Sequence, residues 1–218
     1  MEPILRTTLI PDWIAAILLV SLILMVVSKE RFGYRFSVFM SLISNTKYIL
    51  VFNKKQGFIH PFQLIWHVFA VLNCSLFLYL NKNQIAIIFQ NSDLLSISFT
   101  NIILAITAFV LMKQLAQLIH GSFFNSLKMM QEFLFKKSSY FNYASLLFFV
   151  SNIISLFLLA DSMLLFIISL ACVLSVTLIG WLAILRNRQK YITDQFFYFI
   201  LYLCALEIAP FLVIGSVL

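Results

Sequence analysis

Charged residues are scarce in this sequence of 218 residues. They make up 11% of the chain, whereas hydrophobic residues make up 62% and the mean hydropathy is +1.01. Soluble domains carry about 25% charged residues, because their surfaces face water. The shortage of charge therefore excludes an ordinary soluble domain and predicts an all-α protein whose helices lie in a lipid bilayer.

Catalytic and metal-binding motifs are also missing. The sequence has no GxSxG, Walker loop, GxGxxG or paired acidic motif, so we expect neither enzymatic activity nor a cofactor. Cys74, Cys172 and Cys204 lie in apolar runs without CxxC spacing, which argues against a disulfide framework or a zinc site. The chain contains five glycines and four prolines. This scarcity disfavours the paired helix interruptions that many transporters use.

Long apolar runs occupy nearly the whole chain, and a helical span needs about 20 such residues. We therefore expect residues 1–218 to form a single integral membrane domain, a polytopic transmembrane helical bundle. Lys29, Glu30 and Arg31 follow the first run instead of preceding it, so this run is predicted to stay as a span and not to be a cleaved signal peptide. The six predicted spans are 13–28, 61–80, 94–112, 141–159, 162–185 and 196–218.

Basic residues gather in alternate links between these spans. All of the 15 Lys and Arg residues except Arg6 and Lys82 lie in segments 29–60, 113–140 and 186–195. Basic links stay in the cytoplasm, so both termini are predicted to lie outside it. The same distribution accounts for the net charge of +7, and we do not expect a nucleic-acid partner.

Two of the predicted cytoplasmic links contain amphipathic stretches, at residues 34–52 and 123–137. Arg35, Asn45 and Lys47 would be costly in hydrocarbon, so the first stretch is predicted to be an interfacial helix instead of a further span. Membrane lipid is the expected partner of both stretches. Docking of a partner protein is the alternative.

Glu207 is the sharpest polar signal, because it lies near the middle of the last predicted span. A charge there costs roughly 2.5 to 3.5 kcal/mol, and Pro210, one turn later, is expected to kink the helix. Asn73, Asn101 and Asn152 fall at a similar depth, which predicts a buried polar layer. Three interpretations stay open: hydrogen bonds that fix helix packing, a proton or ion relay through Glu207, and contact with a partner's membrane helix.

Histidines provide a weaker candidate site. His60 and His67 share one face of the second predicted span, and His120 lies just beyond the third. No HxxxH or HExxH spacing is present, so we expect no metal and interpret His67 as a hydrogen-bonded residue of the bundle.

The end of the chain, YFILYLCALEIAP from Tyr198 to Pro210, resembles the C-terminal signature of a Bacteroidota family of small multi-spanning inner-membrane proteins, described as a domain of unknown function. The most specific part is the YLCxLExxP-like run, Tyr202 to Pro210. Ala205 and the polar residues 142–145 depart from the usual pattern. Similar stretches elsewhere, which extend the resemblance over nearly the whole chain, are His60–Phe62, Ser75–Tyr79, Lys113–Leu115 and Gly121–Phe124.

The resemblance implies a helical bundle of the bacterial inner membrane with no established activity. It adds no catalytic residues, but it makes Glu207 and Pro210 stronger candidates for a shared role. The leading hypothesis from the sequence is a non-enzymatic subunit or assembly factor of a cell-envelope complex. The alternative is a small proton- or ion-coupled permease centred on Glu207. The partner, the solute and the oligomeric state are left open by the sequence.

Overall fold

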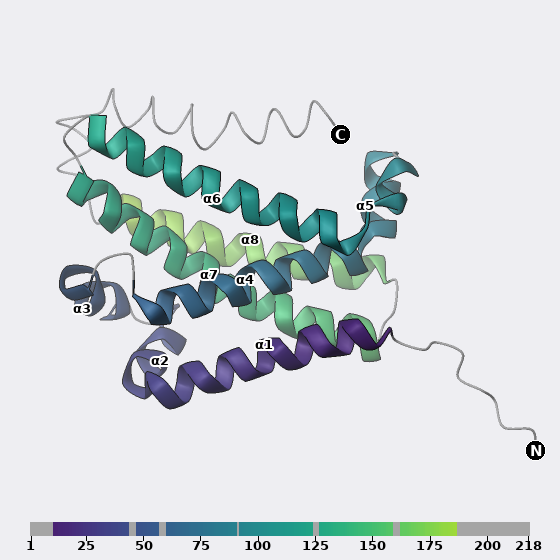
Figure 1. The fold of residues 1–218 in the computed structure, drawn as a ribbon, viewed down its shortest axis with the longest axis horizontal. Coiled ribbons are helices and arrows are strands. Elements are labelled where there is room, and N and C mark those ends of the chain that lie inside the picture. Colours follow the sequence, from purple (N-terminus) through teal and green to yellow (C-terminus); the bar gives the residue numbers. More distant parts are fainter. Residues whose placement is uncertain are drawn as a thin grey trace, which may run out of the picture.

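The computed structural model describes residues 11–43, 47–56, 60–90, 92–123, 127–158 and 162–186, and within them the chain is helical without a strand (Figure 1). The all-α prediction is therefore confirmed for these residues. The described helices are α1 (Asp12–Arg31), α2 (Gly33–Met40), α3 (Lys47–Gln56), α4 (Pro61–Leu80), α5 (Lys82–Phe89), the 3₁₀-helix η1 (Ser92–Ser96), α6 (Phe99–Phe123), α7 (Leu127–Phe157) and α8 (Met163–Arg186).

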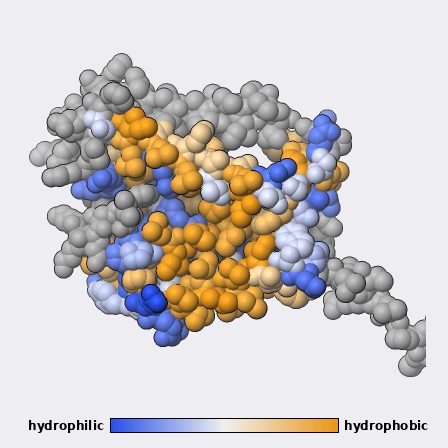
Figure 2. Space-filling view, viewed as in Figure 1, coloured by the Kyte–Doolittle hydropathy of each residue, from blue (hydrophilic) through white to orange (hydrophobic). Residues whose placement is uncertain are grey.

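Five of these helices, α1, α4, α6, α7 and α8, are long and apolar enough to cross a membrane. They lie roughly side by side (Figure 1). Figure 2 shows hydrophobic side chains over the middle of the helices and hydrophilic ones toward the two ends. The described helices thus fit a multi-pass membrane protein. The sixth predicted span, 196–218, lies outside the described residues.

Helix α4 lies at the centre of the bundle and contacts α1, α6 and α7. His60 caps its N-terminus, since the Nδ1 atom of His60 accepts a hydrogen bond from the backbone N–H of Phe62 at 3.1 Å. Pro61 follows at the first helical position, where its fixed φ suits a helix and its missing N–H costs nothing. Local sequence thus determines where α4 begins.

Paired polar residues join α1 to α4 at two levels, each seven residues apart along both helices. The indole Nε1 of Trp66 donates to the hydroxyl of Ser28 at 2.8 Å. The amide Nδ2 of Asn73 donates to the hydroxyl of Ser21 at 3.2 Å. A seven-residue interval returns to the same helical face after two turns, so these pairs fix the register of the two helices.

The second amphipathic stretch differs from its prediction as a separate surface helix. Residues 127–157 form one continuous helix, α7, whose first turns belong to the bundle, because Leu134 and Phe135 are buried. No glycine or proline occurs between Leu127 and Phe157, so nothing in the backbone interrupts the helix. Similarly, the third apolar run starts its long helix at Phe99, five residues beyond the predicted start, because η1 occupies its first residues.

The first amphipathic stretch also differs, since it forms two short helices, α2 and α3, in place of one. They fold back over one end of the bundle (Figure 1). Their buried side chains join α4 and α7 in an aromatic cluster, which we call the aromatic end cluster: Phe39, Tyr48, Phe52, Phe62, Trp66, Phe69, Phe135 and Tyr140. The first link is therefore part of the packed core, and the physical reason is that burial against aromatic rings stabilises Phe39 and Tyr48 more than a lipid headgroup layer would.

Candidate functional site

A chain of hydrogen bonds runs through the buried polar residues of α2, α3, α4 and α7. The Nε of Arg35 donates to the hydroxyl of Tyr48 at 3.4 Å, and this hydroxyl donates to Oε1 of Gln63 at 3.4 Å. The Nε2 of Gln63 in turn donates to the hydroxyl of Ser138 at 3.0 Å. Three consecutive helices, α2, α3 and α4, are thereby joined to the distant helix α7.

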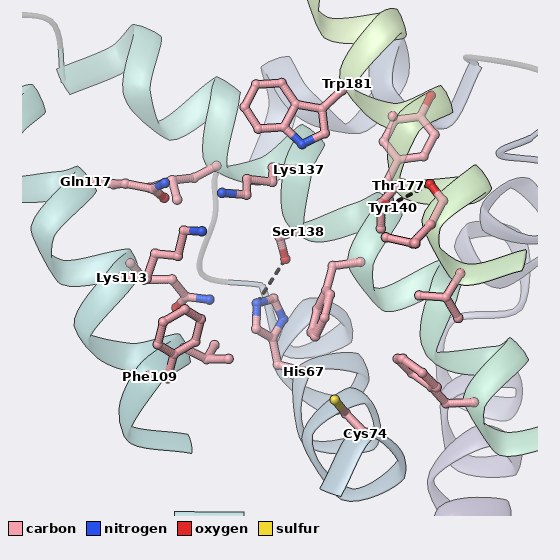
Figure 3. Close-up of a pocket in the computed structure, with 18 residues that line it drawn as sticks. His67, Cys74, Phe109, Lys113, Gln117, Lys137, Ser138, Tyr140, Thr177 and Trp181 are labelled. Atoms are coloured by element: carbon pink, nitrogen blue, oxygen red, sulfur yellow. Dashed lines mark hydrogen bonds between the residues drawn. The ribbon is translucent and has the colours of Figure 1, made fainter. Parts of the chain in front are cut away.

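His67 ends this chain. Its Nε2 lies 2.9 Å from the hydroxyl of Ser138, and its Nδ1 lies 2.8 Å from the backbone carbonyl of Gln63 (Figure 3). A neutral ring with its proton on Nδ1 donates to the carbonyl and accepts from Ser138. The side-chain amide of Asn142 is also close, 3.3 Å from Nδ1. The ring is thus oriented by neutral partners on α4 and α7.

Arg35 is buried, with 4% of its surface exposed, and its guanidinium lies over aromatic rings. The centroids of the Phe52, Phe62 and Tyr48 rings are 4.7, 5.1 and 5.8 Å from its Cζ. Ring faces attract a desolvated cation. The three aromatic rings therefore stabilise the charge of Arg35, which would be costly in lipid hydrocarbon. Burial raises the pKa of Tyr48 above its ordinary value, although the Arg35 charge opposes this, and the phenol stays a donor to Gln63.

Three of the four residues of the predicted polar layer, Asn73, Asn101 and Asn152, lie in the described part of the chain. Asn73 on α4 and Asn152 on α7 are both fully buried, and Nδ2 of Asn152 donates to the backbone carbonyl of Asn73 at 3.0 Å. Together with the Asn73–Ser21 bond, this contact joins α1, α4 and α7. Asn101 is exposed near the start of α6 and does not join them. Glu207 and Pro210 lie outside the described residues.

A cavity of about 380 Å³ opens beside His67, between α4, α6, α7 and α8 (Figure 3). A second cavity of about 400 Å³ lies between α4 and α6 and shares His67, Val110 and Gln114 with the first. We call the first the lysine cavity, because Lys113 of α6 and Lys137 of α7 both line it. Its lining also includes Cys74, Phe109, Gln117, Phe148, Val173, Thr177 and Trp181.

Close packing of α7 against α8 forms one wall of the lysine cavity. Gly180 faces Tyr140 so closely that a Cβ at this position would lie 2.6 Å from the ring atom Cγ. Glycine therefore permits the approach of the two helices, as small residues do at membrane helix contacts.

No group of three or more potential metal ligands occurs among the residues that the structure describes. His60 caps α4, and His67 contacts Gln63, Ser138 and Asn142. His67 is a candidate from the sequence, whereas Gln63 and the two cavity lysines emerge only in the structure. Gln63 could have been found from the sequence, because residues four apart on a helix lie on the same face and Gln63 is four residues before His67. The proximity of Lys113 to Lys137 has no sequence signal, because it depends on how α6 packs on α7.

Acidification is expected to weaken the cap of α4. Burial, with the charge of Arg35 as a second cause, lowers the pKa of His60 below its usual value of about 6.5. A histidine with a lowered folded-state pKa contributes stability above pH 6.5, and that contribution is lost as the pH falls below this value. Between pH 8 and pH 5 in detergent, the midpoint temperature of thermal unfolding should therefore fall more steeply for the wild type than for His60→Asn. Asparagine can cap the helix but does not titrate in this range. Parallel curves for the two proteins would contradict this prediction.

Comparison with known proteins adds a family but no activity. No curated protein and no solved structure matches the chain. A family model described as Domain of unknown function (DUF4271) matches residues 14–218, which include every described long helix almost completely. The chain therefore belongs to the DUF4271 family.

Proposed function

We propose that this protein is a non-enzymatic subunit or assembly factor of a membrane complex in the cell envelope. The observation that supports the proposal is the exposure of α6, which is the least buried of the five long helices. Leu104, Ala108, Leu111 and Leu115 are exposed on it at intervals of three and four residues. Such intervals place them on one face, which we call the α6 stripe.

The α6 stripe has the character of a contact between membrane helices. Lipid tails are as apolar as leucine, so helices associate in a bilayer by close packing, and small residues allow their backbones to approach. Ala108 provides such a residue between Leu104 and Leu111. By contrast, the polar side chains of α4 and α7 are engaged in hydrogen bonds within the bundle, which favours a scaffold over a reaction centre.

Topology forms part of the same proposal. We infer six spans with the basic links on the cytoplasmic side, both termini outside the cytoplasm, and a place in the inner membrane of a Bacteroidota cell. The described basic side chains support this orientation, because Lys29 and Arg31 lie in the last turn of α1, at the end of the bundle that α2 and α3 cover, whereas Lys82 begins α5 at the other end (Figure 1). Basic residues are retained on the cytoplasmic side.

Purification of the tagged chain from its native membrane in mild detergent, followed by mass spectrometry, tests the subunit role. We expect a stoichiometric partner with the wild type and its loss with Ala108→Trp, because the indole would block close approach along the α6 stripe. Leu178→Trp on the exposed face of α8 is the matched control and should retain the partner. Glu207→Gln tests in parallel whether the last predicted span takes part. A clean monomer or homo-oligomer in every case would contradict the proposal.

A small proton- or ion-coupled permease using Glu207 is the second candidate, and the lysine cavity beside His67 is the observation that favours it. A permease needs water in such a cavity. Cys74 lines the cavity, so a Cys172→Ser/Cys204→Ser variant reports access through Cys74 alone. Rapid labelling of Cys74 by a charged thiol reagent in membranes would favour the permease, and protection would favour the subunit.

A further inference from the structure

We propose that the lysine cavity binds one anionic phospholipid, with the phosphate at Lys113 and Lys137 and part of an acyl chain inside. This goes beyond the subunit role and does not depend on it. The two ammonium groups come from different helices, α6 and α7, and line the same cavity. In Figure 3 they point into the same region, with Gln117 beside them.

Charge complementarity is the first argument for this occupant. Lys113 and Lys137 line the cavity, and no Asp or Glu is among the described residues that line it. The Nζ atoms of Lys113 and Lys137 lie 5.7 and 5.9 Å from the ring centroids of Phe109 and Trp181. Each ammonium group therefore lies beside an aromatic ring, whose face attracts a cation, and both positive charges stay at the lining of the cavity. The part of the cavity that the two lysines line is thus suited to an anion.

The apolar interior is the second argument, because it distinguishes a lipid from a soluble anion. Cys74, Phe109, Phe148 and Val173 line the cavity and carry no charge. Cys74 lies on the far side of His67 from the lysines (Figure 3). A free phosphate gains nothing from these side chains, whereas an acyl chain gains van der Waals contacts when it packs on them.

Size and position are the third argument. A volume of about 380 Å³ lies at the lower end of ordinary ligand pockets, of roughly 300 to 1,000 Å³, so it holds a headgroup and part of one chain while the rest stays in the bilayer. Trp181 and Tyr140 line the same cavity, and such amphipathic rings favour the headgroup level of a membrane. The lysine cavity therefore combines two basic side chains, amphipathic aromatic rings and an apolar remainder of its lining.

Native mass spectrometry of the full chain in detergent tests the proposal. The probes are phosphatidylglycerol and phosphatidylcholine with identical acyl chains, each titrated into delipidated protein. We expect the wild type to retain phosphatidylglycerol at least about tenfold more tightly. Lys113→Gln/Lys137→Gln should abolish this preference, whereas Lys113→Arg/Lys137→Arg should keep it. The matched charge control is Lys29→Gln/Arg31→Gln, at exposed positions at the end of α1, and it should behave as the wild type.

A second variant keeps the test independent of charge. Thr177→Phe places a ring in the cavity and should lower phosphatidylglycerol binding about tenfold or more while leaving both lysines in place. Glycerol phosphate, which has no acyl chain, should not displace the lipid at equal concentration. The proposal is overturned if the wild type shows no preference, if both cavity variants bind as the wild type does, or if glycerol phosphate competes as well as the lipid.

Discussion

Replacing Phe39 by alanine should lower the free energy of unfolding by about 3 to 5 kcal/mol, the range for truncating a buried aromatic side chain. Phe39 is 1% exposed, and its ring packs against Tyr48, Phe62 and Trp66 with centroids 5.4, 5.7 and 4.6 Å away. Truncation removes these contacts and leaves a cavity in the aromatic end cluster. Chemical denaturation in detergent, followed by tryptophan fluorescence, measures the loss.

Tyr34→Ala supplies the matched control for this measurement. Tyr34 lies on the same short helix, α2, but is 64% exposed, so its truncation should change the stability by less than about 0.5 kcal/mol. The comparison separates two descriptions of the first link. If α2 rested on the membrane surface, both variants would have similar small effects. A large effect of Phe39→Ala alone is the expected result of packing in the core.

Gln63→Leu should destabilise the protein by about 2 to 4 kcal/mol. Gln63 accepts from Tyr48 and donates to Ser138, and all three side chains are buried. Removing its amide leaves the Tyr48 hydroxyl without this acceptor and the Ser138 hydroxyl with His67 but without its donor, and an unsatisfied buried polar group costs about 1 to 3 kcal/mol. Leucine has a similar size, so the loss reports hydrogen bonding more than cavity formation. Equilibrium unfolding of the purified protein is again the measurement.

A double-mutant cycle with Gln63→Leu, Ser138→Ala and the variant that carries both substitutions measures the interaction between these two residues. If Gln63 and Ser138 interact directly, the double variant should lose less stability than the sum of the single variants, by about 0.5 to 3 kcal/mol. Gln114→Leu on α6 is the matched control, because Gln114 lines both cavities and is only partly buried, and its effect should be small. If the losses in the free energy of unfolding for the Gln63 and Ser138 variants are additive, the two side chains are not coupled as the chain of hydrogen bonds requires.

Several features of the fold could be predicted from the sequence because they depend on neighbouring residues. Long apolar runs predict long helices, and the structure contains five that can cross a membrane. Pro61 at the start of α4 is a local signal of the same kind. Local reasoning was wrong for residues 123–137, although the absence of glycine and proline from 127 to 157 was available as a signal for a continuous α7.

The candidate site was less accessible to sequence reasoning. Depth along the predicted spans placed Asn73, Asn101 and Asn152 in one layer, but depth does not give the direction in which a side chain points. The side chain of Asn152 donates to the backbone carbonyl of Asn73, the side chain of Asn73 donates to Ser21 of α1, and Asn101 is exposed on α6. Rotation of each helix about its axis decides between these outcomes, and that rotation follows from packing against its neighbours.

The sequence by itself determined that this protein is helical and suited to a membrane, because hydropathy and helix capping act over a few adjacent residues. The tertiary structure alone decided where the polar residues act. Arg35 was expected to avoid hydrocarbon, yet Phe52 of α3 and Phe62 of α4 hold it in the core. Lys113 and Lys137 share a cavity only because α6 and α7 pack together. Contacts of this kind join residues far apart in the chain, and no local pattern encodes them.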